Sequence, residues 1–433
     1  MQAPGHTRRF LLLQGPHGPF LGQLAAMLRR AGAQVWRVGF NRGDQAFWPD
    51  KATYIAFHGL IDAWPATLVS LIRAHAITDL VLYGDTRPVH AQAILQARAA
   101  GLTVHVFEEG YLRPHWVTYE RGGSNGHSRL MDMSVARMRA HLDATDVDLA
   151  SAPAHWGDRR RHMFWGAVYH GLLLAGRSQY PAFRPHRALT AAQEFWLYAK
   201  RYALLPLHGL QRMAATFRIH RGGFPYHLAL LQLEHDASFQ KHSPFATMAD
   251  FLAVVIDGFA KGAPSHHHLV FKAHPLEDGR VPLARMIRDI AGHHGIAARV
   301  HFVRGGKLAR LLDHATTAVT VNSTAGQQAL WRGLPLKTFG ASVYSKPEFV
   351  SDQPLDQFFS TPNKPDSRAY RDYRRYLLET SQVPGGYYSS RGRQVLLRSV
   401  VDMMLSATDP YDALHADDAA AKPQLRLVSG ARA

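Results

Sequence analysis

Cysteine is absent from this chain of 433 residues, and so is any long apolar run. Without thiols the protein can form no disulfide and no thiolate zinc site, and nothing requires an oxidising compartment. A helix that spans a bilayer needs roughly 18 or more consecutive apolar residues, and no such run occurs. The segment from Met1 to Arg9 is short and polar, unlike a signal peptide. We therefore expect a cytoplasmic protein.

Several familiar catalytic patterns are also missing. The sequence contains no HExxH. The loop from Gln14 to Phe20 lacks the Lys-Ser/Thr pair of a P-loop and does not fit GxGxxG. The 27 histidines show no zinc-like spacing, and the run His266–His268 is better explained as the start of a strand. We expect neither a metal site nor a resident cofactor.

Positive charge is in excess: 50 Lys and Arg against 33 Asp and Glu give a formal net charge of +17. Such an excess favours an anionic partner, which is nucleic acid, an anionic membrane face or a phosphorylated substrate. No helix-turn-helix, zinc-finger or RNA-recognition pattern is present, so we expect no nucleic-acid partner.

The order of apolar runs predicts two α/β halves. From residue 9 to about 130, short apolar runs alternate with helix-like stretches, and the same alternation returns between about 245 and 345. Strands that alternate with helices form βαβ units around a parallel sheet. The predicted strands are Phe10–Leu13, Val35–Phe40, Tyr54–Phe57, Leu80–Tyr83 and Val104–Phe107, then Leu269–Ala273, Val300–Val303, Ala318–Val321 and Leu336–Phe339.

A basic and aromatic segment separates the two halves. Between Trp156 and Arg221 there are 11 Lys and Arg but only two acidic residues, and the spacing is helical over 191–204 and 208–219. This segment is either a helical linker with a solvated basic face or a surface that meets anionic lipid headgroups.

Two α/β halves joined by a connector predict two facing Rossmann-like domains, with a cleft between them to which both sets of strand ends contribute. The expected divisions are a first domain at 1–150, a basic helical connector at 151–225, a second domain at 226–408 and a disordered tail at 409–433. Helices predicted at Ser367–Leu378 and Ser390–Leu405 would pack back across both halves.

Two adjacent carboxylates, Glu108 and Glu109, follow the apolar run Val104–Phe107, and Gly110 lets the chain turn there. They are either part of a solvated acidic loop or functional groups at the carboxyl edge of a sheet, where substrates bind. Neighbouring side chains point in different directions, so one carboxylate can face the site while the other braces a loop. A carboxylate so placed can act as a general base or as a nucleophile in glycosyl transfer. A loop is expected from Arg113 to Ser128, and further polar candidates lie in it or, for Asp85, at another strand end: Asp85, Arg113, Trp116, Glu120, Asn125, His127 and Ser128.

Two candidate phosphate-binding groups lie in the second half. Lys272 and His274 share one face of a predicted strand and offer a cation and a hydrogen-bond donor, and Pro275 ends that strand. The other group opens a predicted helix, where hydroxyls and unpaired amides form an anion site or a plain N-cap. Its members are Asn322, Ser323, Thr324 and Gly326.

In their order along the chain, these clusters resemble those of bacterial glycosyltransferases that use CMP-activated 2-keto sugar acids, namely sialyltransferases and Kdo transferases. Residues 108–128, EEGYLRPHWVTYERGGSNGHS, look like the capsular polysaccharide biosynthesis/export family. So do LQLEHD at 231–236, which contains Gln232, and HSPF at 242–245. The resemblance covers about 9–345 and is greatest for the KpsS type, whose members are similar to β-Kdo transferases.

This resemblance implies a GT-B-like fold and a retaining transfer of Kdo from CMP-Kdo to lysophosphatidylglycerol, the first step of a poly-Kdo linker. The family's catalytic carboxylate falls on Glu109, in a motif often written Glu-Asp-Gly in relatives. Here both positions are Glu, so the choice between Glu108 and Glu109 stays open. The residues that bind the CMP phosphate fall on His274 and on Ser323 and Thr324, and no metal is implied.

The resemblance also implies a peripheral protein on the inner face of the cytoplasmic membrane, with an anionic lysophospholipid as acceptor. Other capsule biosynthesis and export proteins are implied as partners. The basic connector would be attracted to such a surface. Two alternatives stay open: a non-catalytic scaffold of the capsule export assembly, and a transferase that uses CMP-sialic acid.

Overall fold

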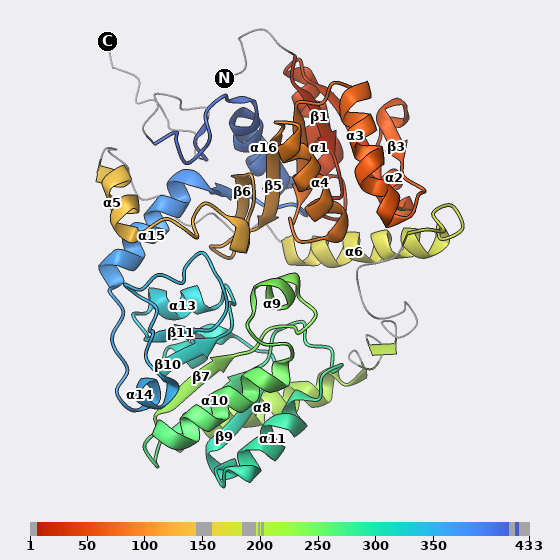
Figure 1. Ribbon diagram of the computed structural model, residues 1–433. Coiled ribbons are helices and arrows are strands. Elements are labelled where there is room, and N and C mark those ends of the chain that lie inside the picture. The colour runs from red at the N-terminus through yellow and green to blue at the C-terminus, as the bar shows by residue number, and fades with distance from the viewer. Residues whose placement is uncertain are drawn as a thin grey trace. The chain divides into compact units, whose positions relative to one another are not determined.

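The computed structural model describes residues 7–143, 158–183, 196–197, 200, 203–414 and 421–423. The chain forms two compact units (Figure 1): unit 1 comprises 1–186 and 374–433, and unit 2 comprises 187–373. The expected connector is therefore divided, with α6 (Asp158–Ala175) in unit 1 and α8 (Leu205–Gly222) in unit 2. Most of the helix expected at 191–204, and the tail beyond 423, lie outside the described residues.

Unit 1 is built on a seven-stranded sheet in the order β12-β6-β5-β4-β1-β2-β3. Neighbours from β3 to β5 pair in parallel, whereas β6 runs antiparallel to β5 and β12 antiparallel to β6. The strands are β1 (Arg9–Leu12), β2 (Gln34–Gly39), β3 (Tyr54–Ala56), β4 (Asp79–Tyr83), β5 (Thr103–Glu109), β6 (Trp116–Arg121) and β12 (Gln382–Pro384).

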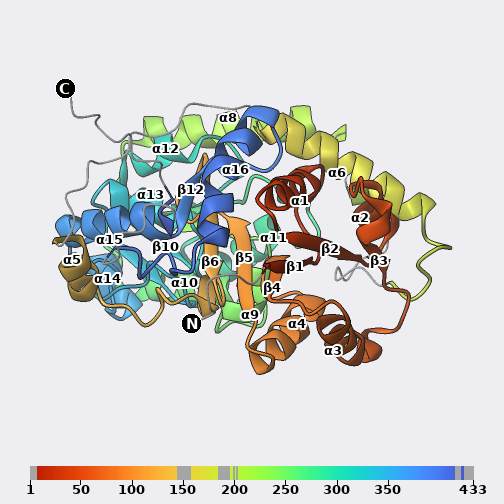
Figure 2. The ribbon, with the colours of Figure 1, turned by 90° about the horizontal axis from the view of Figure 1, so that it is seen from above.

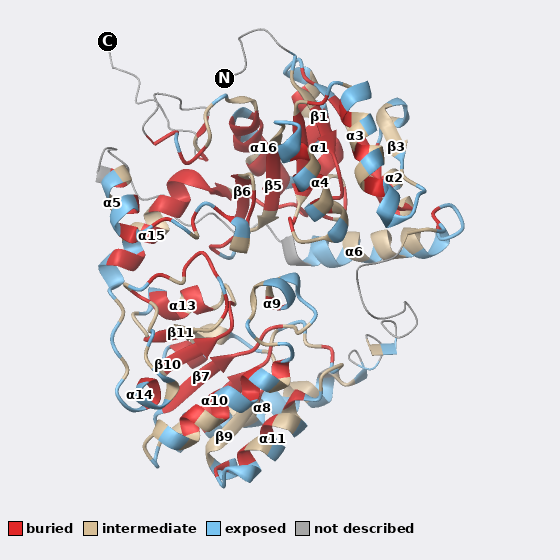
Figure 3. Ribbon diagram, viewed as in Figure 1, coloured by how far each residue is buried: buried red, intermediate tan, exposed pale blue. Residues whose placement is uncertain are grey.

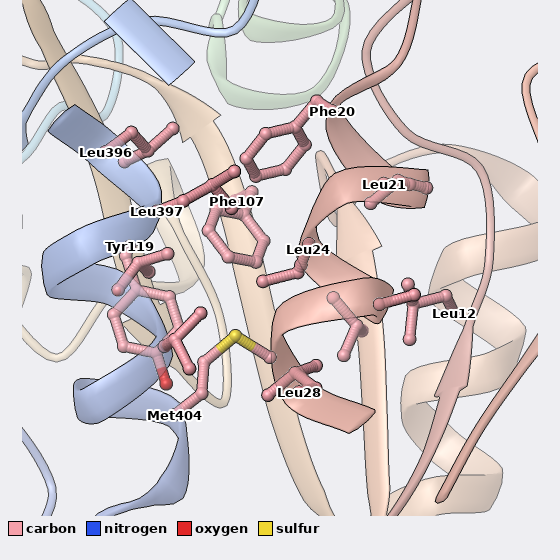
Figure 4. Packing of buried hydrophobic residues seen from close by; sticks show 14 of the residues in the cluster. Leu12, Phe20, Leu21, Leu24, Leu28, Phe107, Tyr119, Leu396, Leu397 and Met404 are labelled. Carbon is pink, nitrogen blue, oxygen red and sulfur yellow. The ribbon is translucent and has the colours of Figure 1, made fainter. Parts of the chain in front are cut away.

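Helices cover both faces of this sheet (Figure 2). Successive side chains of a strand point to opposite faces, so Phe10 and Leu12 pack towards α1 and α16, while Leu11 packs towards α3 and α4. Figure 4 shows Leu24 of α1 and Leu397 of α16 in the first of these two cores. The helices of unit 1 besides α6 are α1 (Phe20–Arg30), α2 (Arg42–Ala46), α3 (Trp64–Ala74), α4 (Pro88–Ala99), α5 (Val135–Asp143) and α16 (Ser390–Leu405).

Two expectations for unit 1 need correction. Residues 116–121, expected as part of a loop, form β6, because Trp116, Val117 and Tyr119 bury their side chains in the sheet. The tail expected to be disordered from 409 is ordered at its start. Tyr411 is buried and its Oη donates to Glu120 Oε1 at 2.6 Å, which anchors residues 409–414 on unit 1.

Unit 2 is built on a five-stranded sheet in the order β11-β10-β7-β8-β9, in which all neighbours pair in parallel. Its central strand, β7, is absent from the strands expected from the sequence. The strands are β7 (Tyr226–Leu230), β8 (His268–Lys272), β9 (Val300–Val303), β10 (Ala315–Thr320) and β11 (Leu336–Thr338).

The core of unit 2 lies between its sheet and α10, α11 and α14, and includes Phe251, Val255 and Phe271. The helices of unit 2 besides α8 are α9 (Ala237–His242), α10 (Met248–Gly262), α11 (Leu283–His293), α12 (Leu308–Leu312), α13 (Gly326–Trp331) and α14 (Leu355–Ser360). Helix α15 (Ser367–Thr380) begins in unit 2 and ends in unit 1, and α16 packs in the core of unit 1.

The order of the parallel strands is the same in both units: β3-β2-β1-β4-β5 in unit 1 and β9-β8-β7-β10-β11 in unit 2. This is the doubly wound order, and it confirms the expected α/β class with parallel sheets. The order reverses between β1 and β4 and between β7 and β10. Ligands bind outside the carboxyl ends of the strands at such a reversal. Within the described residues, no helix is long and apolar enough to cross a bilayer.

Candidate active site

The two adjacent glutamates are the last residues of β5, not the beginning of a loop. Glu108 pairs with Thr118 and Glu109 with Val117 of the antiparallel strand β6. Because neighbouring positions face opposite sides of the sheet, Glu109 shares the side of Phe107, which packs with α1 and α16. Both side chains are half-buried at the carboxyl end of the parallel strands.

Two tyrosines hold the carboxylate strand. Tyr83 Oη, at the end of β4, donates to Glu109 Oε1 at 3.1 Å, and Tyr387 Oη donates to the carbonyl oxygen of Glu108 at 2.8 Å. The two rings pack edge to face with centroids 5.4 Å apart. Burial raises the pKa of Tyr83 well above its ordinary value, so at neutral pH its hydroxyl stays protonated and orients Glu109. Neither tyrosine was among the expected site residues.

Glu108 differs in its surroundings. Burial, reinforced by the charge of Glu109, raises its pKa to about 7, although Arg113 and Arg87 oppose the rise. Its Oε1 accepts from the amide of Glu109 at 2.9 Å. A Cβ at Gly84, where φ is +71°, would lie 3.3 Å from Glu108 Oε2. Glu108 therefore lies against the turn after β4 and can gain or lose a proton near neutral pH.

The other acidic candidate after β4, Asp85, is buried and braces the loop that follows β6. Its Oδ2 accepts from the amide of Ser124 at 2.9 Å and lies 3.0 Å from His127 Nδ1. The amide of Asn125 donates to Tyr111 Oη at 2.6 Å. The structure thus brings Asp85, Asn125 and His127 together as supports of this loop.

Three further candidates from this stretch contribute to the packing of unit 1. Trp116 is buried on β6, and Ser128 Oγ donates to the buried Glu120 at 2.9 Å. Burial raises the pKa of Glu120 to about 8, against the hydrogen bonds from Tyr411 and Ser128. Arg113, by contrast, is exposed and donates from Nε to the carbonyl oxygen of Gly110 at 3.1 Å.

In unit 2, Lys272 is a buried cation at the carboxyl end of β8. Its Nζ donates to the carbonyl oxygen of Ala273 at 2.9 Å. Burial, together with the positive charge of Arg212, lowers the pKa of Lys272 to about 8. Two nearby positive charges favour an anionic ligand, because an anion would relieve their repulsion.

Arg212 is a residue that the sequence analysis missed. It lies on α8, and a Cβ at Gly306 would lie 2.9 Å from Arg212 Cδ. Gly305 and Gly306 both have positive φ, at 61° and 83°, in the turn after β9. Glycine in that turn therefore makes room for the arginine to approach the end of the sheet. No motif links positions 212 and 272, so only the fold could reveal the pair.

Gln232 and Asn322 join the two strand ends at the reversal in strand order of unit 2. Gln232 Nε2 donates to Asn322 Oδ1 at 2.7 Å, and the amide of Asn322 donates to Gln232 Oε1 at 2.9 Å. This reciprocal pair is buried and fixes the turn after β10. The pair has a structural role, and Asn322 Nδ2 also donates to the carbonyl oxygen of Ser238 at 2.9 Å.

The polar run after β10 makes a turn before α13. Ser323 Oγ accepts from the amide of Ala325 at 3.2 Å, and its carbonyl oxygen accepts from the amide of Gly326 at 2.9 Å. The N-cap of the six-residue α13 is Ala325, which makes no side-chain cap hydrogen bond, so a plain turn explains Ser323 and Gly326. Thr324 is half-buried in the same turn, and its carbonyl accepts from the amide of Gln327.

His274 follows β8 and is half-buried, with Pro275 exposed after it. The amide of Leu276 donates to His274 Nδ1 at 3.1 Å, so the neutral ring carries its proton on Nε2. That nitrogen can donate to a phosphate oxygen. Lys272 is the last residue of β8 and His274 follows it in the turn, so both lie at the same strand end. No group of His, Asp and Glu in the described parts of the chain has an arrangement that could hold a metal ion.

Comparison with known proteins gives three findings. The chain is 31% identical over 383 residues to the capsule polysaccharide export protein KpsS of Escherichia coli. This match covers 88% of this chain and 97% of that protein. The chain is 32% identical over 392 residues to the capsule polysaccharide modification protein LipB of Neisseria meningitidis serogroup A, with 88% and 92% covered. Among solved structures, KpsC, a beta Kdo 2,7 transferase of Thermosulfurimonas dismutans, is 12% identical, with a TM-score of 0.44 over 92% of this chain and 100% of that chain.

The similarity to the KpsC structure is too weak to support an argument, but the two sequence matches cover most of this chain and most of each relative. The family model described as capsule polysaccharide biosynthesis protein matches residues 78–388. That range contains both the glutamate pair of unit 1 and the lysine and histidine of unit 2. The chain belongs to the capsule polysaccharide biosynthesis protein family.

Proposed function

We propose that this protein is a glycosyltransferase that moves Kdo from CMP-Kdo to a lysophospholipid, lysophosphatidylglycerol, and so begins the poly-Kdo linker of a capsule. The observation that carries the proposal is the glutamate pair at the end of β5. One member, Glu109, is oriented by Tyr83, and the other, Glu108, has a pKa near 7. Membership of the capsule family supports the setting, since relatives are named for capsule export and modification.

In this proposal Glu109 is the nucleophile. Its carboxylate attacks the anomeric carbon of Kdo, the bond from that carbon to the phosphate oxygen breaks, and CMP leaves with the bonding electron pair. The acceptor hydroxyl then attacks the same carbon and displaces Glu109, and two inversions give net retention. The hydroxyl proton passes to Glu108, which is partly ionised near neutral pH. Tyr83 would act as a positioning residue in this scheme, through its hydrogen bond to Glu109.

Unit 2 would bind the nucleotide. Lys272 and Arg212 supply positive charge for the donor phosphate, and His274 supplies a hydrogen bond from Nε2. CMP is a good leaving group once its phosphate charge is neutralised, so this binding also favours departure. The reaction needs no metal in this scheme, because the cationic side chains perform that neutralisation.

The acceptor is a membrane lipid, which suits a peripheral protein at the inner face of the cytoplasmic membrane. Arg160 and Arg161 at the start of α6 are exposed; the side chain of Arg159 lies outside the described residues. Anionic lipids attract such clusters by about 1 kcal/mol per basic residue. Replacing all three arginines with Gln should therefore weaken sedimentation with phosphatidylglycerol vesicles. Unchanged sedimentation would contradict this role of α6.

The direct test incubates the purified protein with CMP-Kdo and fluorescent lysophosphatidylglycerol, beside Glu109→Gln and His274→Ala. We expect wild type to add one Kdo and both variants to lose that product while keeping the wild-type circular dichroism spectrum. Lys261→Gln, an exposed change on α10, serves as a control that should retain activity.

Other outcomes separate the alternatives. Product from CMP-sialic acid but not from CMP-Kdo would correct the donor and keep the mechanism. Binding of lipid-linked chains without product from either donor, unaffected by Glu109→Gln, would support the export scaffold and refute the transferase.

A further inference from the structure

A stripe of large apolar side chains lies uncovered along α8. Leu207, Leu210, Met213 and Phe217 are exposed to between 48 and 62%. Steps of three or four residues place these side chains on one face of a helix, and Figure 3 shows exposed residues on α8. Single exposed apolar residues are ordinary, but a contiguous patch marks an interaction surface.

The opposite face of α8 already provides its attachment to unit 2. Ile219 is buried, and the helix contacts β9. Arg212 approaches the turn at Gly306, as described above. Among the residues that the structure describes, the stripe therefore stays about half exposed while the opposite face packs on unit 2, and it is available to a partner.

The charges beside the stripe indicate which partner it fits. Arg218 and Arg221 are exposed, and the Arg221 guanidinium lies 5.7 Å from the centroid of the Phe217 ring. The helix, LPLHGLQRMAATFRIHRG, contains no acidic residue. An apolar face bordered by arginines is typical of helices that lie in the interface of an anionic bilayer. Apolar contact with another protein would require neither arginines beside the stripe nor the absence of acidic residues from α8.

We propose that α8 docks this protein on anionic membranes, with Leu207, Leu210, Met213 and Phe217 inserted among the acyl chains. Arg218 and Arg221 lie at the level of the lipid phosphates and bind them. This inference deepens the proposed function, on which it rests for its purpose, because it names the surface that reaches the bilayer of the lipid acceptor. It does not depend on which sugar is transferred.

The absence of cysteine allows a direct test. Leu210→Cys gives a single thiol that can carry an environment-sensitive fluorophore, and Leu95→Cys on α4, where Leu95 is 63% exposed, is the matched control. With vesicles of phosphatidylcholine and phosphatidylglycerol, the label at 210 should brighten and shift to the blue, and the label at 95 should not. An unchanged label at 210 would overturn the inference.

A second variant tests the energetics without a label. Leu210→Gln with Phe217→Gln should weaken vesicle binding at least roughly tenfold, since burial of each side chain contributes about that factor. Leu95→Gln should leave binding unchanged. If the label at 210 shifts without vesicles and the double variant converts a dimer to a monomer in gel filtration, the stripe is a contact between copies and the inference is wrong.

Activity separates this inference from the proposed function. With a short-chain, water-soluble lysophospholipid the double variant should transfer Kdo as well as wild type does, but it should fail with acceptor embedded in vesicles. No product from either acceptor, with a normal shift at 210, would refute the transferase and retain the docking surface. Equal activity of wild type and double variant on vesicles would refute the docking surface alone.

Discussion

Two residues of the candidate site titrate near neutrality, so Kdo transfer should depend on pH through both. Glu108, whose pKa is raised to about 7, must be ionised to accept the proton of the acceptor. Lys272, whose pKa is lowered to about 8, must be protonated to bind the phosphate. Because Glu108 acts after CMP has left, the value of kcat/KM for the acceptor should rise with pH through about 7. The value of kcat/KM for the donor should fall with pH through about 8.

The size of the effect follows from these two values. Near pH 7.5 about 76% of the enzyme would have Glu108 ionised and about 76% would have Lys272 protonated, against about 9% for Glu108 at pH 6 and about 9% for Lys272 at pH 9. Each value of kcat/KM should therefore fall about eightfold, for the acceptor at pH 6 and for the donor at pH 9. Bound phosphate stabilises the protonated lysine, so the upper limb should move to higher pH in kcat.

Two variants test which residue causes each limb of the pH profile. Glu108→Gln should lower kcat and remove the acidic limb, while Lys272→Arg should keep donor binding and remove the basic limb, because arginine does not titrate in this range. Release of CMP, followed from pH 5.5 to 9.5, provides the assay, and Lys261→Arg on α10 is a control that should change neither limb. A flat wild-type profile, or an acidic limb that survives Glu108→Gln, would refute the roles given to these residues.

Three more predictions concern stability and binding. Burial raises the pKa of Glu120 from 4.5 to about 8, so the free energy of unfolding falls as pH rises through this range. The variant Glu120→Gln should therefore be more stable than wild type by up to about 3 kcal/mol at pH 7. Near pH 4.5 the two proteins should be equally stable. Thermal unfolding at both pH values checks this, and a constant difference would contradict it. Arg212→Ala should raise the KM for the CMP donor roughly tenfold with less effect on kcat, whereas Arg288→Ala on α11 should change neither. Gly110→Ala should destabilise the protein by roughly 3 kcal/mol or more in urea titration, because the new Cβ would lie 2.3 Å from the carbonyl oxygen of Trp116.

The alternation of apolar runs and helices was sufficient to predict most of the parallel strands, since that pattern reflects burial of both sheet faces. The same reasoning failed for β6, which was expected to be part of the loop from Arg113 to Ser128. The signal was present in the period-2 spacing of Val117 and Tyr119, both buried. For the glutamate pair, the sequence indicated the position but not the difference in surroundings between Glu108 and Glu109.

The remaining site residues depend on contacts between distant segments. Tyr387 lies 279 positions after Glu108, and Arg212 has no local pattern that relates it to Lys272. The expected domain boundaries differ from the two compact units for the same reason. A division of the chain into successive segments cannot show that residues 374–433 return to unit 1. The pairing of β12 with β6 and the packing of α16 in the core of unit 1 reveal that return.

The return of the C-terminal segment has a consequence for biosynthesis. A chain emerging from the ribosome has made β5 and all of unit 2 before it makes β12, α16 or Tyr387. Until then the apolar face at Phe107 lacks its cover from α16, and the backbone of Glu108 lacks the hydroxyl of Tyr387. A nascent or prematurely terminated chain therefore presents that face to chaperones and proteases, and the paired carboxylates reach their final surroundings only after Tyr387 and α16 have been synthesised.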